Sequence, residues 1–230
     1  MEFYELKIKV ILKEDMYFTD VSYNIGVFIN NSMLNNSLLK KIHEDKFYKY
    51  VFDSFYPLEK SGIYKKDNYY TFRLRSMNLQ LLNKMAMAIY NHEYNGIKAV
   101  DVDLSLRKVD KINEIISIKP TIVTIDNQPW LKEKDSIDLI KTKLNDNLSK
   151  KLKQIKGNDS IKEEIDFIES IELLSKKPAK YKYKNINLLG NKFNIKVKED
   201  ELSQSKALMA IALGLGEKGS SLGAGFCNYK

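Results

Sequence analysis

The sequence has very little of the chemistry that builds disulfides or metal sites. Cys227 is its only cysteine, which excludes a disulfide framework and any cysteine-based zinc site. There are two histidines, and no group of acidic residues has the spacing of metal ligands. Long apolar runs are also missing: none approaches the roughly 18 residues of a membrane-spanning helix, and Met1 to Glu5 do not begin a signal peptide. We therefore expect a cytoplasmic protein without a membrane partner, a metal site or a cofactor.

Arginine is scarce although the chain is basic, with a formal net charge of +8 at pH 7. The three arginines are Arg73, Arg75 and Arg107, so lysine supplies most of the positive charge. A basic protein favours a polyanion or another anionic surface as its partner. Lysine acts as a point charge on phosphate and reads base edges less well than arginine does. If the partner is a nucleic acid, we expect its phosphates to provide most of the affinity.

Glycine is sparse in most of the chain and concentrated near its end. Five of the ten glycines lie in residues 214–226, which we call the glycine-rich loop. Such clusters occur where the backbone needs a positive φ or approaches a ligand, and successive amides can form a cradle for phosphate oxygens. Lys218, Ser220 and Ser221 add one charge and two hydroxyl donors. The loop is therefore a candidate anion site, and the alternative is a tight turn that packs a C-terminal strand.

Two well-known phosphate-binding motifs do not fit this loop. Gly214, Gly216 and Gly219 satisfy G-x-G-x-x-G, but that motif follows a strand, opens a helix and precedes an acidic residue about 20 positions later. Here a predicted helix precedes the loop, and the sequence ends at Lys230. A P-loop needs a lysine after its last glycine, whereas Gly219 is followed by Ser220. A generic nucleotide-binding enzyme is therefore disfavoured.

Alternating apolar residues predict an α+β first half. Strands are expected at residues 3–12, 48–55, 69–76 and 97–105, and helices at about 20–31, 38–46 and 78–90. This β-α-β-β-α-β order is typical of a ferredoxin-like fold. Within the third strand, the alternation directs Phe72 towards the core and Arg73 and Arg75 to the opposite face.

A second half of similar size begins near Arg107. Strands are expected at residues 111–118, 121–125, 165–174 and 224–229, and helices at 133–156 and 202–213. The segment 165–174 also suits a helix, but a strand is favoured. Residues 181–188 and 193–198 are expected to form a hairpin around Gly190. We therefore predict two domains, residues 1–106 and 107–230, although no sequence repeat relates them.

His43 is the residue best suited to proton transfer. Imidazole titrates near neutral pH, and Lys49, six residues later, can face the same cleft as a fixed cation. Cleavage of RNA by its own 2′-hydroxyl needs these functions, because the 2′-oxygen loses a proton, the 5′-oxygen gains one, and charge develops on the phosphate. This reaction requires no metal ion. The alternative is that His43 is an ordinary surface residue at a helix end.

Other residues suit either a binding role or an ordinary surface. His92 follows a predicted helix and is favoured as a surface residue over a second proton carrier. The alternation of tyrosine and lysine over residues 181–184 suits base stacking and phosphate binding, as does Tyr69 beside the two arginines of its strand. Both stretches suit solvated strand faces equally well. The lysines of residues 133–156 are interspersed with acids, which favours a solvated helix face.

Three features together resemble a known family. The glycine-rich loop, the spacing from His43 to Lys49 and the stretch 117–123 (Ser-Ile-Lys-Pro-Thr-Ile-Val) are similar to those of CRISPR repeat-processing endoribonucleases. These are tandem ferredoxin-like (RRM-like) proteins of the repeat-associated mysterious protein superfamily, and the resemblance covers essentially the whole chain. It implies an α+β fold of tandem ferredoxin-like domains with a C-terminal glycine-rich loop. It also implies metal-independent cleavage of precursor CRISPR RNA within its repeats, which leaves 2′,3′-cyclic phosphate and 5′-hydroxyl ends.

The resemblance implies catalytic roles for single residues. His43 would be the general acid or base, and Lys49 the cation that stabilises the transition state. Many relatives have a tyrosine in the first helix, whereas residues 28–29 are phenylalanine and isoleucine here and the nearby tyrosine is Tyr23. Either Tyr23 takes that role, or another residue such as His92 does, or two groups suffice.

The expected RNA contacts come from basic residues of the first half and from the glycine-rich loop: Lys46, Arg73, Arg75, Gly216, Lys218, Gly219, Ser220, Ser221 and Gly223. The alternative function is a non-catalytic RNA-binding subunit of a CRISPR effector complex, which would share the fold but need neither His43 nor Lys49. The expected partner is CRISPR repeat RNA, with other effector subunits as further candidates, and the protein is expected to be a monomer or a homodimer. The sequence leaves open the repeat sequence, the cleavage position, the need for an RNA hairpin and the CRISPR subtype.

Overall fold

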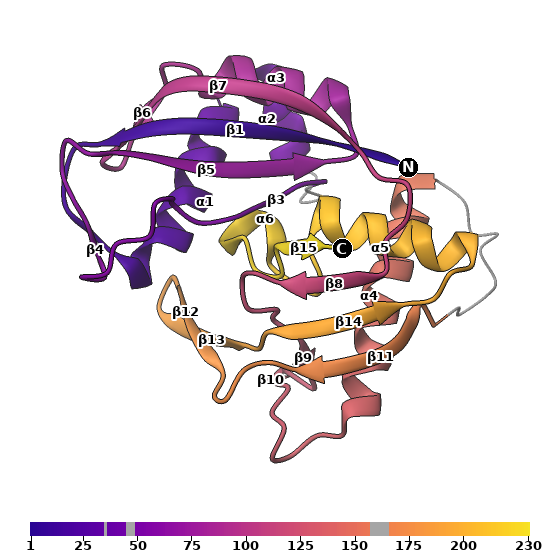
Figure 1. Cartoon of the computed structure of the whole chain (residues 1–230). Coiled ribbons are helices and arrows are strands. Elements are labelled where there is room, and N and C mark those ends of the chain that lie inside the picture. The colour runs from indigo at the N-terminus through magenta and orange to yellow at the C-terminus, as the bar shows by residue number, and fades with distance from the viewer. Residues whose placement is uncertain (35, 45–48, 157–165) are drawn as a thin grey trace.

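The first strand forms the centre of the N-terminal half. The computed structural model describes residues 1–34, 36–44, 49–156 and 166–230. In it, alternating apolar residues of the first strand, such as Leu6, lie opposite Leu74 and Leu104 of its two neighbours. The sheet is antiparallel, in the order β3-β5-β1-β7-β6 (Figure 1), and its strands are β1 (Glu2–Leu12), β3 (Val51–Phe52), β5 (Tyr69–Ser76), β6 (Glu93–Tyr94) and β7 (Ile97–Lys108).

Three helices of the first half pack with this sheet: α1 (Phe18–Leu34), α2 (Ser37–Glu44) and α3 (Leu79–Ile89). Alternate residues of β1, including Ile8 and Val10, are fully buried in a core shared with α1 and α3. Burying an aliphatic side chain of this size contributes about 1.5–3 kcal/mol. α3 begins where Asn78 accepts a hydrogen bond from the amide of Leu81 at 2.9 Å, a typical N-cap. Within the described residues, the predicted helices of this half are confirmed.

The second half contains a four-stranded antiparallel sheet and two long helices (Figure 1). The strand order is β11-β14-β8-β15, and the elements are β8 (Glu114–Ser117), α4 (Ile137–Lys156), β11 (Ile168–Leu173), β14 (Phe193–Val197), α5 (Glu201–Leu213) and β15 (Cys227–Tyr229). α5 buries nearly all of its side chains because it contacts strands of both sheets. The core of this half includes side chains from both α4 and α5.

The two halves share one topology although their sequences show no repeat. If the main strands of each half are counted along the chain, both sheets have the spatial order second, third, first, fourth: β3-β5-β1-β7 and β11-β14-β8-β15. In each half a helix follows the first main strand and another follows the third. The result is a mixed α+β protein with two antiparallel sheets, each with its own buried core.

The predicted hairpin around Gly190 is wrong. The hairpin is formed by β12 (Ala179–Tyr183) and β13 (Ile186–Gly190), which turn at Lys184 with a φ of 53°, while β14 pairs with β11 and β8. Gly190 serves a different purpose, because a Cβ there would lie 2.9 Å from the carbonyl oxygen of Thr121. The glycine therefore permits a close approach of two backbones rather than a turn.

Smaller differences concern short elements. Of the strand predicted at 48–55, β3 alone is regular in the described residues, and Tyr56 makes an isolated bridge with Thr71. The strand predicted at 121–125 shortens to β9 (Thr124–Ile125), which pairs with β10 (Gln128–Pro129). Two further features were not predicted: β2 (Met16–Tyr17) pairs with β4 (Ile63–Tyr64), and α6 (Gly219–Leu222) forms inside the glycine-rich loop.

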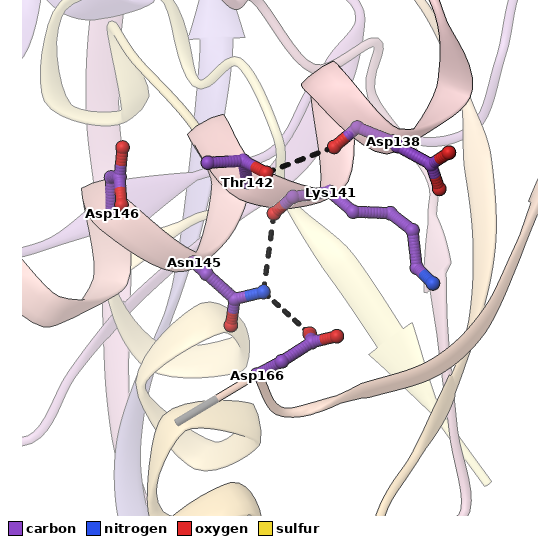
Figure 2. Close-up of a pocket in the computed structure, with 6 residues that line it drawn as sticks. All are labelled: Asp138, Lys141, Thr142, Asn145, Asp146 and Asp166. Carbon is purple, nitrogen blue, oxygen red and sulfur yellow. Dashed lines mark hydrogen bonds between the residues drawn. The ribbon is translucent and has the colours of Figure 1, made fainter. Parts of the chain in front are cut away.

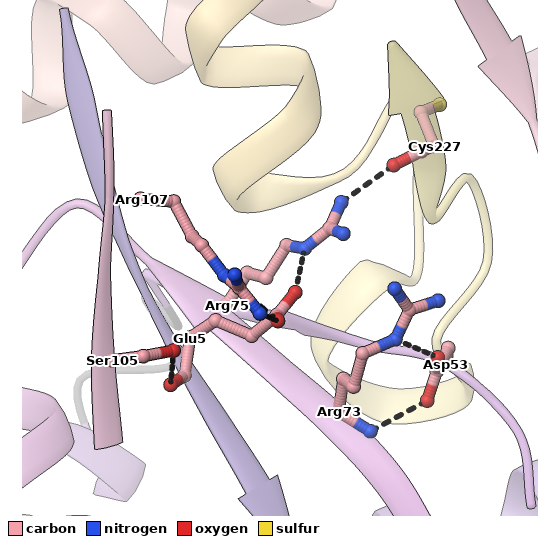
Figure 3. Close-up of polar contacts among 7 residues, drawn as sticks. All are labelled: Glu5, Asp53, Arg73, Arg75, Ser105, Arg107 and Cys227. Carbon is pink, nitrogen blue, oxygen red and sulfur yellow. Dashed lines mark hydrogen bonds and ion pairs between the residues drawn. The ribbon is translucent and has the colours of Figure 1, made fainter. Parts of the chain in front are cut away.

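Arg73 and Arg75 face away from the core of the first half, as the alternation predicts, but the second half covers this face (Figure 3). Arg75 is 4% exposed, pairs with Glu5 at 2.7 Å and donates to the carbonyl of Cys227 at 2.6 Å. Arg73 pairs with the buried Asp53 at 2.7 Å. The guanidinium carbons of Arg73 and Arg75 lie 4.9 and 4.2 Å from the ring centroid of Phe226. This network joins the two halves and leaves Arg75 almost no surface for RNA, so its prediction as an RNA contact is corrected. Arg73, whose side chain is 29% exposed, stays a predicted RNA contact.

Candidate functional site

The short helix α2 carries His43 in its last turn. The helix begins where the side chain of Asn36 accepts a hydrogen bond from the amide of Leu39 at 3.2 Å, and the buried Leu39 anchors it to the core. The side chain of His43, and the predicted RNA contact Lys46, lie outside the described part of the structure. Six residue steps separate His43 from Lys49, so their α-carbons are at most roughly 20 Å apart.

Lys49 lies at a pocket of about 450 Å³ formed by both halves of the chain. The first half contributes Tyr4, Lys49 and residues 76–80, and the second half contributes Ile155 and Leu213. The hydroxyl of Ser76 fixes the backbone here, because it donates to the carbonyl of Lys49 at 2.6 Å and accepts from the amide of Asn78 at 3.0 Å. The pocket therefore combines a lysine with the positive N-terminal end of α3, which suits a phosphate group.

Tyr23 lies at a different pocket from Lys49. It lines a groove of about 370 Å³ between residues such as Asp20, in the part of the chain that follows the end of β1, and Lys182 and Lys184 of the β12–β13 hairpin. The Lys49 pocket includes Tyr4, near the start of β1. Strand length alone puts these two ends of β1 about 25 Å apart. The structure thus does not bring Tyr23 to Lys49, and its catalytic role stays a prediction that the arrangement does not support.

His92 is half-buried, although it was favoured as a surface residue. Its ring lies 5.1 Å from that of Phe28 and 6.5 Å from that of Tyr94, measured between centroids. Burial lowers the pKa of its imidazole. His92 follows the C-terminal end of α3, while Lys49 lies near the N-terminal end, so the length of this 11-residue helix, about 16 Å, separates them. His92 is therefore poorly placed to act with Lys49.

The glycine-rich loop packs tightly between the halves. A Cβ on Gly216 would lie 2.5 Å from the carbonyl oxygen of Ile122, and one on Gly223 would lie 2.2 Å from that of Phe52. Both glycines also have positive φ values, of 73° and 64°. Packing a C-terminal strand, the alternative weighed from the sequence, thus accounts for these two glycines. The solvent-accessible part of the loop is residues 217–221, of which Lys218 is exposed and the others are half-buried. RNA binding by this part stays a prediction.

Lys151 of α4 is a residue that sequence reasoning missed. Its ammonium donates to the carbonyl oxygens of Gly214 at 2.6 Å and Gly216 at 3.0 Å, at the C-terminal end of α5. Burial lowers the pKa of Lys151 to about 8. One lysine of the charged helix thus fixes the start of the glycine-rich loop, whereas the charge pattern indicated a solvated face.

Lys119, in the stretch that carried the family resemblance, is buried between the halves. Its ammonium donates to the hydroxyl of Ser22 in α1 at 2.6 Å and lies 5.5 and 5.8 Å from the ring centroids of Phe52 and Tyr181. Burial lowers the pKa of Lys119 to about 7. An unfolded lysine titrates near 10.4, so between these values the unfolded state binds a proton that the folded state lacks. Stability therefore rises with pH across this window, and below it the folded state bears the full cost of a buried charge.

We expect Lys119→Met to stabilise the protein at pH 6. Methionine fills similar space without a charge, so the variant avoids the cost of holding a charged ammonium in a buried position, a gain on the order of a few kcal/mol. The gain should shrink at pH 9, because the lysine is then neutral in the folded state. Urea unfolding of both proteins at the two pH values measures the difference. An equal gain at both would show that the charge of Lys119 is not the cause.

The pocket drawn in Figure 2 lies on α4 and is unsuited to RNA. Three carboxylates line it, from Asp138, Asp146 and Asp166, against the single cation of Lys141. Its polar contacts are structural: Asn145 donates to Asp166 at 2.5 Å and accepts from the amide of Phe167 at 3.1 Å, which ties the chain before β11 to α4. The net negative charge of this pocket would repel a phosphate.

Within the described residues, no group of three or more histidine, cysteine, aspartate or glutamate side chains is placed to hold a metal ion. Among the described helices, none is long and apolar enough to cross a membrane.

Comparisons with known proteins identify the fold. No protein-family model matches the sequence, and no curated protein is significantly similar to it. Among solved structures, a CRISPR-associated protein Cas6 is 18% identical, with a TM-score of 0.75 and 99% of each chain covered. A RAMP protein described as binding different RNA substrates is 15% identical, with a TM-score of 0.73 and the same coverage. A Cas6-related protein from Pyrococcus furiosus is 17% identical, with a TM-score of 0.71 and 98% of each chain covered. The chain therefore has the fold of Cas6 and RAMP proteins over nearly its full length.

Proposed function

We propose that this protein is a metal-independent endoribonuclease that cleaves precursor CRISPR RNA within its repeats. The observation that carries the proposal is the position of Lys49, in a pocket between the halves shortly after the helix of His43. It occurs in a chain that matches Cas6 structures end to end, one of which is described as a product complex. The shared strand order of the halves supports a tandem ferredoxin-like architecture with domains 1–106 and 107–230.

The proposed reaction uses the 2′-hydroxyl of the RNA as the nucleophile. His43 takes the proton from the 2′-oxygen as this oxygen bonds to phosphorus, and the bond from phosphorus to the 5′-oxygen breaks. The leaving 5′-oxygen takes up a proton from water, and His43 later releases its proton to the solvent, so the ends are a 2′,3′-cyclic phosphate and a 5′-hydroxyl. The ammonium of Lys49 and the amides at the N-terminus of α3 stabilise the negative charge that develops on the phosphate oxygens.

The second candidate is an RNA-binding subunit without catalytic activity, which acts within a CRISPR effector complex. It is favoured by the similarity to a RAMP protein that is described by RNA binding alone, and by the separation of Tyr23 and His92 from Lys49. In both cases the partner is CRISPR repeat RNA. The candidates differ in whether the RNA is cut.

Incubation with labelled repeat RNA in EDTA distinguishes them. We expect a single cut that persists in EDTA and is abolished by a 2′-deoxy substitution at the cut position, because the nucleophile is then absent. The ends are identified by their mobility and by phosphatase treatment. Tight binding without any cut would replace the nuclease by the binding subunit. A cut that survives the 2′-deoxy substitution would exclude the proposed chemistry.

A further inference from the structure

The β12–β13 hairpin places a tyrosine at the boundary between the halves. Alternation along β12 buries Tyr181, whose hydroxyl donates to the carbonyl of Pro120 at 2.8 Å, and leaves Tyr183 half-buried near the turn. The ring of Tyr183 packs edge-on against that of Tyr23 in α1, with centroids 6.3 Å apart. The apolar cluster beneath includes Leu222 of α6. The ring is therefore fixed by three segments that are far apart in the sequence.

Two exposed lysines lie close to this ring. The ammonium of Lys218, in the glycine-rich loop, is 5.1 Å from the ring centroid of Tyr183, and that of Lys184, at the hairpin turn, is 5.8 Å from it. Ammonium groups this close to an aromatic face interact favourably with it, but at exposed sites the interaction is weak. A ligand that has both a flat ring and negative charges can therefore displace one ammonium group from the face of Tyr183. Its ring then stacks on the tyrosine, and its negative charges pair with the two lysines.

The adjoining groove has room for such a ligand. It has a volume of about 370 Å³, and Tyr23 and Lys184 are among its lining residues. Three acids and two lysines line the groove. Glu14 is one of the acids, and the other two are held by cations: Asp20 pairs with Lys182 at 3.0 Å, and Asp15 with Lys65 at 2.9 Å. Their charges are thus partly compensated, and Lys184 and Lys218 face the ring.

We propose that Tyr183, flanked by Lys184 and Lys218, is a stacking subsite for one base of a single-stranded RNA segment. The ligand follows from the chemistry, because a single strand exposes base faces to stack on the ring and phosphates for the two ammonium groups. The subsite lies at the opposite end of β1 from the Lys49 pocket, so it holds a part of the RNA remote from the cut. It rests on the proposed function only in taking RNA as the ligand.

The test is equilibrium binding of a single-stranded RNA of about ten nucleotides, within the range that single-strand binding modules cover. The RNA carries 2-aminopurine, whose fluorescence falls when it stacks. We expect Tyr183→Ala and Tyr183→Leu to weaken binding about 10-fold and to remove the quenching, because both variants lose the ring on which the base stacks. Tyr183→Phe keeps the ring and should bind as the wild type does. Tyr90→Ala, which removes an exposed tyrosine at the end of α3, is the matched control.

Three outcomes would overturn the subsite. They are unchanged binding by Tyr183→Ala, wild-type binding and quenching by Tyr183→Leu, and equal losses for the single strand and for a duplex of the same sequence. If Tyr183→Ala fails to fold, as judged by circular dichroism, Tyr183→Leu and the double variant Lys184→Ala/Lys218→Ala decide, with weaker binding again expected. Binding requires no cut, so these results stand apart from the cleavage assay. Loss of stacking in a protein that never cleaves would support the subsite and reject the nuclease.

Discussion

Replacing His43 by alanine is expected to slow cleavage of repeat RNA by about 10²–10⁴-fold, the usual contribution of a general acid or base. RNA binding should survive, because the affinity is expected to come mainly from lysines that contact phosphates. Single-turnover cleavage with excess enzyme measures the chemical step, and equilibrium binding of an RNA that is 2′-deoxy at the cut measures affinity separately. A loss confined to cleavage places His43 in the reaction.

The matched control is His92→Gln. It removes the second imidazole of the chain, which lies at the far end of α3 from Lys49. We expect its cleavage rate to stay near that of the wild type. If His43→Ala cleaves normally, His43 is a helix-end surface residue, and if only His92→Gln is inactive, the assignment of the two histidines is reversed. The pH dependence of cleavage adds a check, because a histidine base requires the rate to rise through the pKa of an imidazole.

The elements that are predicted well from the sequence are those whose side chains pack within their own half of the chain. β5 was predicted with the bounds that it has, because every second residue from Tyr70 to Leu74 is buried beneath the helices of the same half. α3 was predicted within one residue at either end, since its cap at Asn78 and its apolar stripe are local signals. Periodicity in the sequence indicates which residues are buried, and β5 and α3 are buried by elements of their own half of the chain.

The errors share a cause: contacts between segments that are far apart in the sequence. The alternation predicts the direction of Arg75, but its ion pair depends on Glu5 in β1, and its hydrogen bond depends on Cys227, 152 residues later. Gly190 looks like a turn residue until Thr121 is placed against it. Lys119 and Lys151 look like solvated lysines until the other half of the chain, or the end of α5, covers them.

The candidate site divides in the same way. The spacing between His43 and Lys49 is visible in the sequence, because it depends on a helix end and a short connection. That Lys49 shares a pocket with Ile155 and Leu213 of the second half is not visible. The glycines of the loop indicate an unusual backbone, but the sequence does not give the cause. The structure gives it for Gly223, which faces the backbone of Phe52. A cluster of glycines indicates close approach, and the sequence alone does not say whether the neighbour is a phosphate or another strand.

Replacing Glu5 by glutamine is expected to destabilise the protein by about 3–5 kcal/mol, the usual result of removing one partner from a buried ion pair. Glu5 is 3% exposed and lies between Arg75, at 2.7 Å, and Arg107, at 2.8 Å (Figure 3). Burial opposes its ionisation, but the two guanidinium groups outweigh it and hold the pKa of Glu5 below its usual value. Glutamine fits the same space without the charge, so Arg75 is left buried without a carboxylate. Urea unfolding at pH 7 gives the free energy of unfolding of both proteins.

The control replaces a carboxylate in an exposed pair, Glu199→Gln. Glu199 pairs with Lys111 at 2.5 Å, but its side chain is 80% exposed, and water and salt screen such a pair so that it contributes little. Lowering the pH should abolish the difference between Glu5→Gln and the wild type, because the stability from a carboxylate of lowered pKa is present above its unfolded value and disappears as the pH falls through its folded value. A loss at pH 7 no larger than that of Glu199→Gln would show that the network carries little energy. The halves would then be joined chiefly by apolar contacts such as those of α5, and the pocket around Lys49 would owe its shape to packing rather than to charge.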